Sequence, residues 1–144
     1  SARAAAAATR QVALIMRDPG AATAVTDQQL ESLAEPLRAM EAARRAKADY
    51  AAIAEHDFAF HRRFVALAGN RRMTEIYDTM LAQTALLLLT AAEANPTLRS
   101  DLDRPVHRAI LDALESRDLR RAREAVEEHY RYAEERLFAQ IAGG

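Results

Sequence analysis

Apolar residues recur three and four positions apart along most of the chain, a spacing that places them on one face of a helix. Turn and capping residues interrupt this pattern. Residues 18–20 (Asp-Pro-Gly) are a turn signal, and Thr26 with Gln29 is typical of a capping box that begins a helix. Gly69 suits the left-handed conformation that ends many helices. The pattern predicts six helices, at about 2–17, 26–48, 49–68, 73–93, from between 100 and 105 to 116, and 118–141.

Three residues refine these predicted boundaries. Pro36 falls inside the second helix, where it should kink the helix or split off its first turns. Pro105 is tolerated in the first turn of the fifth helix, and Asp118 can cap the sixth. Because the connections are short, successive helices should pack antiparallel. We therefore expect a single helical domain over residues 1–144.

The composition agrees with a helical fold. Half of the residues are hydrophobic, alanine and leucine supply most of these, and there are only four glycines and four prolines. Alanine and leucine lose little entropy in a helix, whereas a sheet protein would need more β-branched and aromatic residues. The fold class predicted is all-α.

The charge pattern argues against DNA binding by this segment alone. The net charge is −1, and 20 basic and 21 acidic residues alternate along the chain. Phosphate binding needs a basic patch, and no segment provides a long one. No apolar run approaches the roughly 20 residues of a membrane span, and there is no cysteine to ligate a metal or form a disulfide. These features fit a reducing cytoplasm, and the start at Ser1 suggests a fragment.

Four polar residues interrupt the predicted core-facing stripes of three helices. Asp57 and His61 stand four residues apart, so both project from one face of the third helix. His107 and His129 lie on the stripes of the fifth and sixth helices. Polar groups in a core are costly unless paired, and one divalent ion could satisfy all four. The apolar members of the stripes are Ala54, Phe58, Val65 and Ala68; Val106, Ile110, Leu111 and Leu114; and Ala122, Ala125, Val126, Ala133 and Leu137.

Three neutral imidazoles and a carboxylate suit a divalent transition metal, with zinc preferred and nickel or manganese as alternatives. The competing interpretation is structural. In that case each buried histidine is hydrogen-bonded to a neighbour, and the Asp57–His61 pair is a local contact. The fourth histidine, His56, falls off the apolar stripe and is assigned to the surface.

Three stretches resemble the FCD effector domain, which forms the C-terminal half of the FadR-like branch of GntR-family transcription regulators. Residues 57–61 and 67–70 are similar to its D-x-x-F-H…A-G-N signature, and residues 107–114 to its H-R-x-I-L-x-A-[IL] segment. The run from Arg117 through Ala122 and Ala125 to His129 resembles its G-D…A…A…H ending. The resemblance covers about residues 26–139.

The resemblance implies the same four metal ligands, Asp57, His61, His107 and His129. It also implies an antiparallel bundle of six to seven helices that holds a small carboxylate or similar metabolite beside the metal. A winged helix-turn-helix domain, which binds the operator as a homodimer, should precede this segment and is not contained in it.

Some positions depart from the family pattern. Family members usually show an arginine and a glutamate one turn apart in the first helix, whereas Arg3 is followed at that distance by Ala7. The loop at 18–25 is longer than usual, and Arg117 stands where glycine is common. Arg10 and Arg104 are candidates for contacting an anionic effector, with a surface role as the alternative.

The resulting hypothesis is a metal-binding sensor module and not an enzyme. An effector carboxylate would replace a metal-bound water and shift the attached DNA-binding domains between two arrangements of the dimer. Two alternatives stay open. One is a metal-dependent, hydrolase-like bundle enzyme, for which no acid on the core stripes offers a general base. The other is a structural dimerisation module with satisfied buried histidines.

Overall fold

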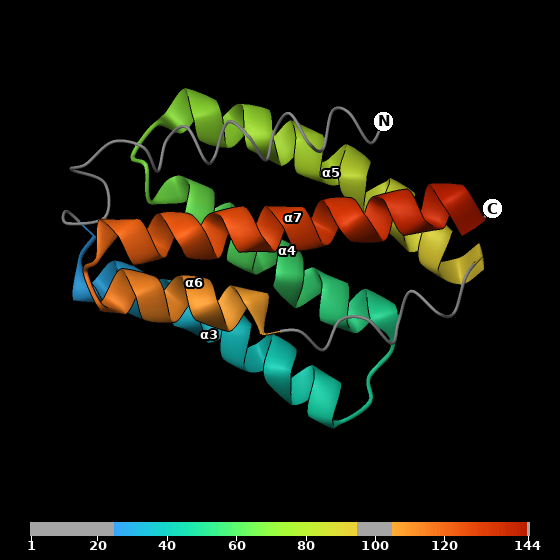
Figure 1. The fold of residues 1–144 in the computed structure, drawn as a ribbon, viewed down its shortest axis with the longest axis horizontal. Coiled ribbons are helices and arrows are strands. Elements are labelled where there is room, and N and C mark those ends of the chain that lie inside the picture. Colours follow the sequence, from blue (N-terminus) through green and yellow to red (C-terminus); the bar gives the residue numbers. More distant parts are fainter. Residues whose placement is uncertain (1–24, 95–104, 144) are drawn as a thin grey trace. The chain divides into compact units, whose positions relative to one another are not determined.

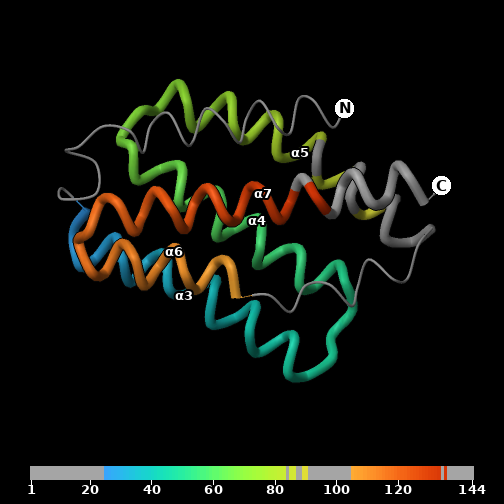
Figure 2. The backbone as a smooth tube through the Cα atoms, in the orientation of Figure 1, coloured from blue at the N-terminus to red at the C-terminus, as the bar shows by residue number. Residues whose placement is uncertain are grey.

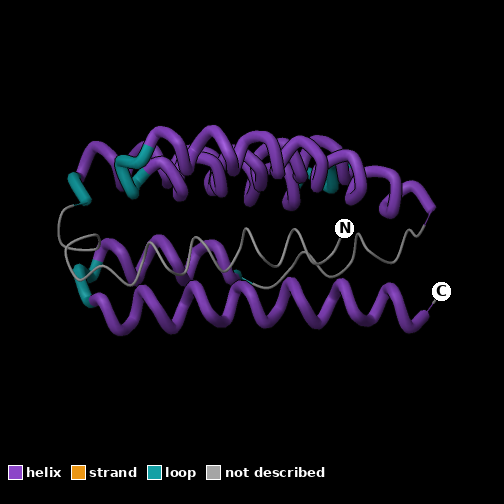
Figure 3. The backbone as a smooth tube through the Cα atoms, turned by 90° about the horizontal axis from the view of Figure 1, so that it is seen from above, coloured by secondary structure: helices purple, strands orange, loops and turns teal. Residues whose placement is uncertain are grey.

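The computed structural model describes residues 25–94 and 105–143, and within them the chain forms five helices and no strand (Figure 3). The helices group into two compact units. Helices α3 (Asp27–Arg45), α4 (Tyr50–Ala66) and α5 (Arg71–Ala94) belong to one unit, and α6 (Val106–Glu115) and α7 (Leu119–Gly143) to the other. The all-α prediction is thus confirmed for the described residues. The predicted helix at 2–17 lies outside them, and the bundle of six to seven helices stays a prediction.

In the first unit, α3 packs against α4, and α4 packs against α5 (Figure 1). The short loops at 46–49 and 67–70 reverse the chain, so that neighbouring helices run antiparallel, as Figure 2 traces in the backbone. In the second unit, α6 packs antiparallel against α7 across the turn at 116–118. The large side chains that are fully buried are Leu33, Leu37, Met40 and Phe60 in the first unit and Leu111, Leu114 and Val126 in the second.

The helix ends follow the local signals in the sequence. Thr26 and Gln29 form the predicted capping box at the start of α3. Asp118 accepts a hydrogen bond from the backbone N–H of Arg121 at 3.1 Å and so caps α7. Gly69 has a φ of +65° after the end of α4, as expected. Asn70 instead caps α5, because its Oδ1 accepts a hydrogen bond from the N–H of Met73 at 3.1 Å.

Helix α3 is continuous through Pro36, so the alternative in which the proline splits off its first turns is wrong. The predicted stripe on α4 was also wrong in part. The predicted stripe on α4 included Phe58, yet Phe58 is only half-buried, whereas Phe60 and Phe64 are buried. Because α4 packs between α3 and α5, it buries a wider arc than one stripe, and periodicity alone did not locate the centre of that arc.

The stripes of α6 and α7 agree better with the structure. All predicted members on α6 are buried, including His107. On α7, Ala122, Val126 and His129 are buried, whereas Ala133 is exposed. Among the described side chains of α7, the buried positions run from Ala122 to His129, and the side chain of Leu137 lies outside the described residues.

Candidate metal centre

Two buried imidazoles meet between α6 and α7. His107 lies in the first turn of α6 with 7% of its surface exposed, and His129 lies on α7 with 9% exposed. Their Nε2 atoms are 3.1 Å apart, and the rings stand nearly perpendicular, with centroids 4.7 Å apart. The antiparallel pairing of α6 with α7 thus brings together two residues that are 22 positions apart.

The contact between the two Nε2 atoms can be favourable in two ways. Either one nitrogen carries a proton and donates it to the other, or both lone pairs bind a cation. Two nitrogens bound to one ion at about 2.0–2.1 Å lie about 2.8–3.4 Å apart for bond angles between octahedral and tetrahedral. The observed 3.1 Å falls within that range. The pair has the separation of two adjacent ligands of one ion.

A second pair lies on α4. The Nδ1 of His61 lies 2.8 Å from the backbone carbonyl oxygen of Asp57, one turn earlier, and 3.3 Å from the Asp57 carboxylate. A nitrogen placed between two oxygen acceptors carries the proton, so Nδ1 donates. The neutral ring then has its lone pair on Nε2, the tautomer that binds a metal through Nε2.

The Asp57 carboxylate also changes the basicity of His61. Burial by itself lowers the pKa of His61, but the negative charge and hydrogen bonding of Asp57 outweigh it, and the pKa is raised above its ordinary value. A carboxylate behind an imidazole strengthens that imidazole as a metal ligand. The same shift makes protons stronger competitors for the ring.

Among the described residues, His61, His107 and His129 form a group of nitrogen donors that could hold a metal ion. Asp57 is not a member of that group; its carboxylate contacts His61 on the same helix. An all-histidine set with a nearby carboxylate suits zinc and other borderline transition metals better than it suits calcium or magnesium, which prefer oxygen ligands.

The profile of the FCD domain matches residues 19–132, most of the chain. The chain belongs to the FCD domain family. FCD domains are the effector-binding domains of GntR-family transcription regulators, so the sensor interpretation is confirmed over the hydrolase alternative. No match was found among curated proteins.

The other predicted site residues of this FCD domain are less informative. Arg10 and Arg104, the candidate effector contacts, lie outside the described residues. His56 is half-buried and not fully exposed. No helix in the described parts of the chain is both long and apolar enough to cross a membrane.

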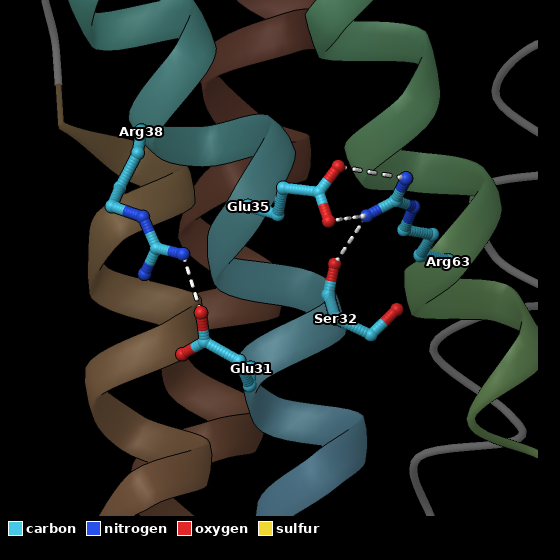
Figure 4. A network of polar contacts seen from close by, with 5 residues as sticks. All are labelled: Glu31, Ser32, Glu35, Arg38 and Arg63. Atoms are coloured by element: carbon cyan, nitrogen blue, oxygen red, sulfur yellow. Dashed lines mark hydrogen bonds and ion pairs between the residues drawn. The ribbon is translucent and has the colours of Figure 1, made fainter.

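Two residues near the candidate ligands were missed by the sequence analysis. The ring of Tyr130 packs edge-on against His129 with centroids 5.4 Å apart, and burial raises the pKa of its phenol. Arg63, two residues after His61, donates a hydrogen bond from Nη1 to the carbonyl oxygen of Ser32 on α3 at 2.7 Å (Figure 4). Pro36 was the available signal for this contact, because a proline inside a helix leaves the carbonyl four residues earlier without its helical donor.

Proposed function

We propose that this FCD domain is a metal-dependent sensor in which Asp57, His61, His107 and His129 bind one divalent ion, with zinc preferred over nickel or manganese. The observation that carries the proposal is the 3.1 Å separation of the Nε2 atoms of His107 and His129. Two buried imidazoles at this distance need a shared proton or a shared cation.

The donor chemistry of the two pairs supports a single ion. Each pair alone supplies two ligands, whereas zinc sites in proteins use three or four protein ligands. Together the pairs supply three imidazoles and one carboxylate. Asp57 would then have two roles: its backbone carbonyl orients His61, and its carboxylate, which contacts His61, would complete the ligand set.

The proposed ligand of the sensor is a small carboxylate metabolite bound beside the ion. The bound ion would supply a cationic anchor for the effector's carboxylate. Arg10 and Arg104 are the proposed further contacts for its negative charge. We further propose that the domain acts in the cytoplasm as part of a homodimer and reaches DNA through an attached winged helix-turn-helix domain.

Regulation would then follow from differential binding. An effector that binds one arrangement of the dimer more tightly than another shifts the population toward that arrangement, and the attached DNA-binding domains follow. The coupling is reciprocal, so operator DNA should change the affinity for the effector by the same factor.

The test is elemental analysis of the purified domain beside the variants His107→Ala and His129→Ala. The expected result is about one divalent ion per chain in the wild type and loss of that ion in both variants. The control is His56→Ala, which removes a histidine outside the proposed ligand set and should keep the metal. A wild type that stays metal-free after incubation with zinc, nickel and manganese would overturn the proposal. A screen of small carboxylates by thermal shift on the loaded protein then tests the effector class.

A further inference from the structure

Pro36 creates a hydrogen-bond acceptor in the middle of α3. In a regular helix, the N–H of residue 36 would donate to the carbonyl of Ser32, and proline has no N–H. The guanidinium of Arg63 on α4 supplies the donor, with Nη1 lying 2.7 Å from the Ser32 oxygen. The same guanidinium contacts the two carboxylate oxygens of Glu35, each at 3.4 Å (Figure 4).

We propose that Arg63 is a positioning residue for the Asp57–His61 pair. This inference rests on the proposed function, since it assigns Arg63 the task of aiming two of the proposed ligands. Arg63 follows His61 by two residues, or about 200° around the helix axis. It therefore holds α4 from the side opposite to His61.

The kind of contact matters for the argument. The buried rings of Phe60 and Phe64 set how closely α4 packs, but apolar packing is non-directional and tolerates small rotations and slides. A hydrogen bond is restricted in both distance and angle. Its acceptor here is a backbone oxygen, which cannot change rotamer. The contact therefore fixes the rotation and the height of α4 on α3, and with them the direction of the His61 ring.

The neighbouring Arg62 provides a matched control. Its Nη2 donates to the carboxylate of Asp78 on α5 at 2.8 Å. Arg62 thus has the same charge on the same helix, but it contacts a side chain that can move with it. Loss of Arg62 should leave the direction of His61 unchanged.

The experiment measures the site directly in the variants Arg63→Ala, Arg63→Lys, Pro36→Ala and Arg62→Ala. One readout, in the metal-free protein, is the set of NOEs between the buried rings of α4 and the side chains of α3, which reports the rotation and height of α4 on α3. The other is titration with Co²⁺, whose absorption bands report the ligand geometry. Pro36→Ala tests the contact from α3, because the new N–H competes with Arg63 for the Ser32 carbonyl.

We expect Arg63→Ala to change the NOEs between α4 and α3, alter the Co²⁺ bands and weaken Co²⁺ binding about 3–10-fold. This is below the 10–100-fold typical of groups that contact a ligand directly. Arg63→Lys should restore part of the loss, Pro36→Ala should change the same readouts to a smaller extent, and Arg62→Ala should match the wild type.

Wild-type NOEs between α4 and α3 in both Arg63→Ala and Pro36→Ala would overturn the inference, even if the proteins were less stable. If Arg63→Ala does not fold, Arg63→Lys and Pro36→Ala decide in its place. If the wild type binds no Co²⁺, the proposed metal function fails, and the NOEs of the metal-free variants still decide whether Arg63 fixes α4 on α3.

Discussion

Arg117 and Lys47 both hold a backbone conformation that is unfavourable for a residue with a side chain. Their φ angles are +57° and +53°. Lys47 lies in the turn after α3, where its N–H bonds the carbonyl of Arg44 and the next N–H, of Ala48, bonds the carbonyl of Ala43 at 2.9 Å. This is the Schellman arrangement, whose left-handed position favours glycine. Arg117 occupies the turn between α6 and α7, where FCD sequences commonly have glycine.

The two sites differ in what the side chain does. Lys47 is exposed, whereas the Arg117 guanidinium donates a hydrogen bond to the carbonyl of Val25. The left-handed conformation costs a non-glycine residue about 1–2 kcal/mol, and glycine loses about 0.5–1 kcal/mol more backbone entropy on folding. Lys47→Gly should therefore stabilise the domain by about 0.5–1 kcal/mol. A charged hydrogen bond is worth about 1.5–3 kcal/mol when buried, which we reduce to about 1 kcal/mol for the half-buried Arg117. Arg117→Gly should therefore be neutral or slightly destabilising.

Thermal unfolding checks both values. An unfolding entropy of about 2.1 cal/mol/K per residue gives about 0.3 kcal/mol/K for 144 residues, so Lys47→Gly should raise Tm by about 2–3 °C. Alanine variants at both positions separate the contributions. The difference between glycine and alanine isolates the backbone and should be the same at both sites. The difference between Arg117→Ala and Lys47→Ala isolates the hydrogen bond to Val25. A glycine variant no more stable than its alanine counterpart would refute the reasoning from φ.

Four further predictions concern the metal site and one glycine. Zinc at a hundredfold excess over its Kd should stabilise the wild type by about 2.7 kcal/mol, which raises Tm by about 9 °C. The Tm of His107→Ala should stay almost unchanged. An equal increase in Tm in both proteins would argue against these ligands. The zinc shift should shrink as pH falls through the raised pKa of His61, because a proton then competes with zinc for its Nε2. In the metal-free protein, the pKa of His61 is raised, so its pairing with Asp57 stabilises the fold below the ordinary histidine pKa of 6.5. This stabilisation is lost as pH rises through the pKa of His61 in the folded protein. Urea unfolding should therefore show that Asp57→Asn lowers the free energy of unfolding more at pH 5.5 than at pH 8. Gly69→Ala should cost about 1 kcal/mol in the same urea assay, from φ alone, because an added Cβ meets no atom within 4 Å; a much larger loss would point to a clash.

The sequence was informative where structure depends on residues close in the chain. The capping box at Thr26, the left-handed Gly69 and the cap at Asp118 each involve partners within a few positions, and all three are confirmed. Pro36 shows where this local reasoning fails. Its cost to α3 is offset by Arg63, which is 31 positions away from Ser32 in sequence and reaches it only after α3 and α4 have packed.

The candidate site divides in the same way. Helical periodicity was enough to place His107 and His129 on buried faces, because burial depends on which face of a helix a residue occupies. Periodicity carries no information on which ring nitrogens meet or which of them holds a proton. Those properties follow from the Nε2 contact between α6 and α7 and from the Asp57 carbonyl that accepts from Nδ1 of His61. In both cases the structure leaves Nε2 as the nitrogen suited to the metal, and a site built from Nε2 donors on separate helices depends on how those helices are held. A substitution that moves α4 without touching a ligand should therefore affect metal binding more than a substitution of equal cost on the exposed face of α7.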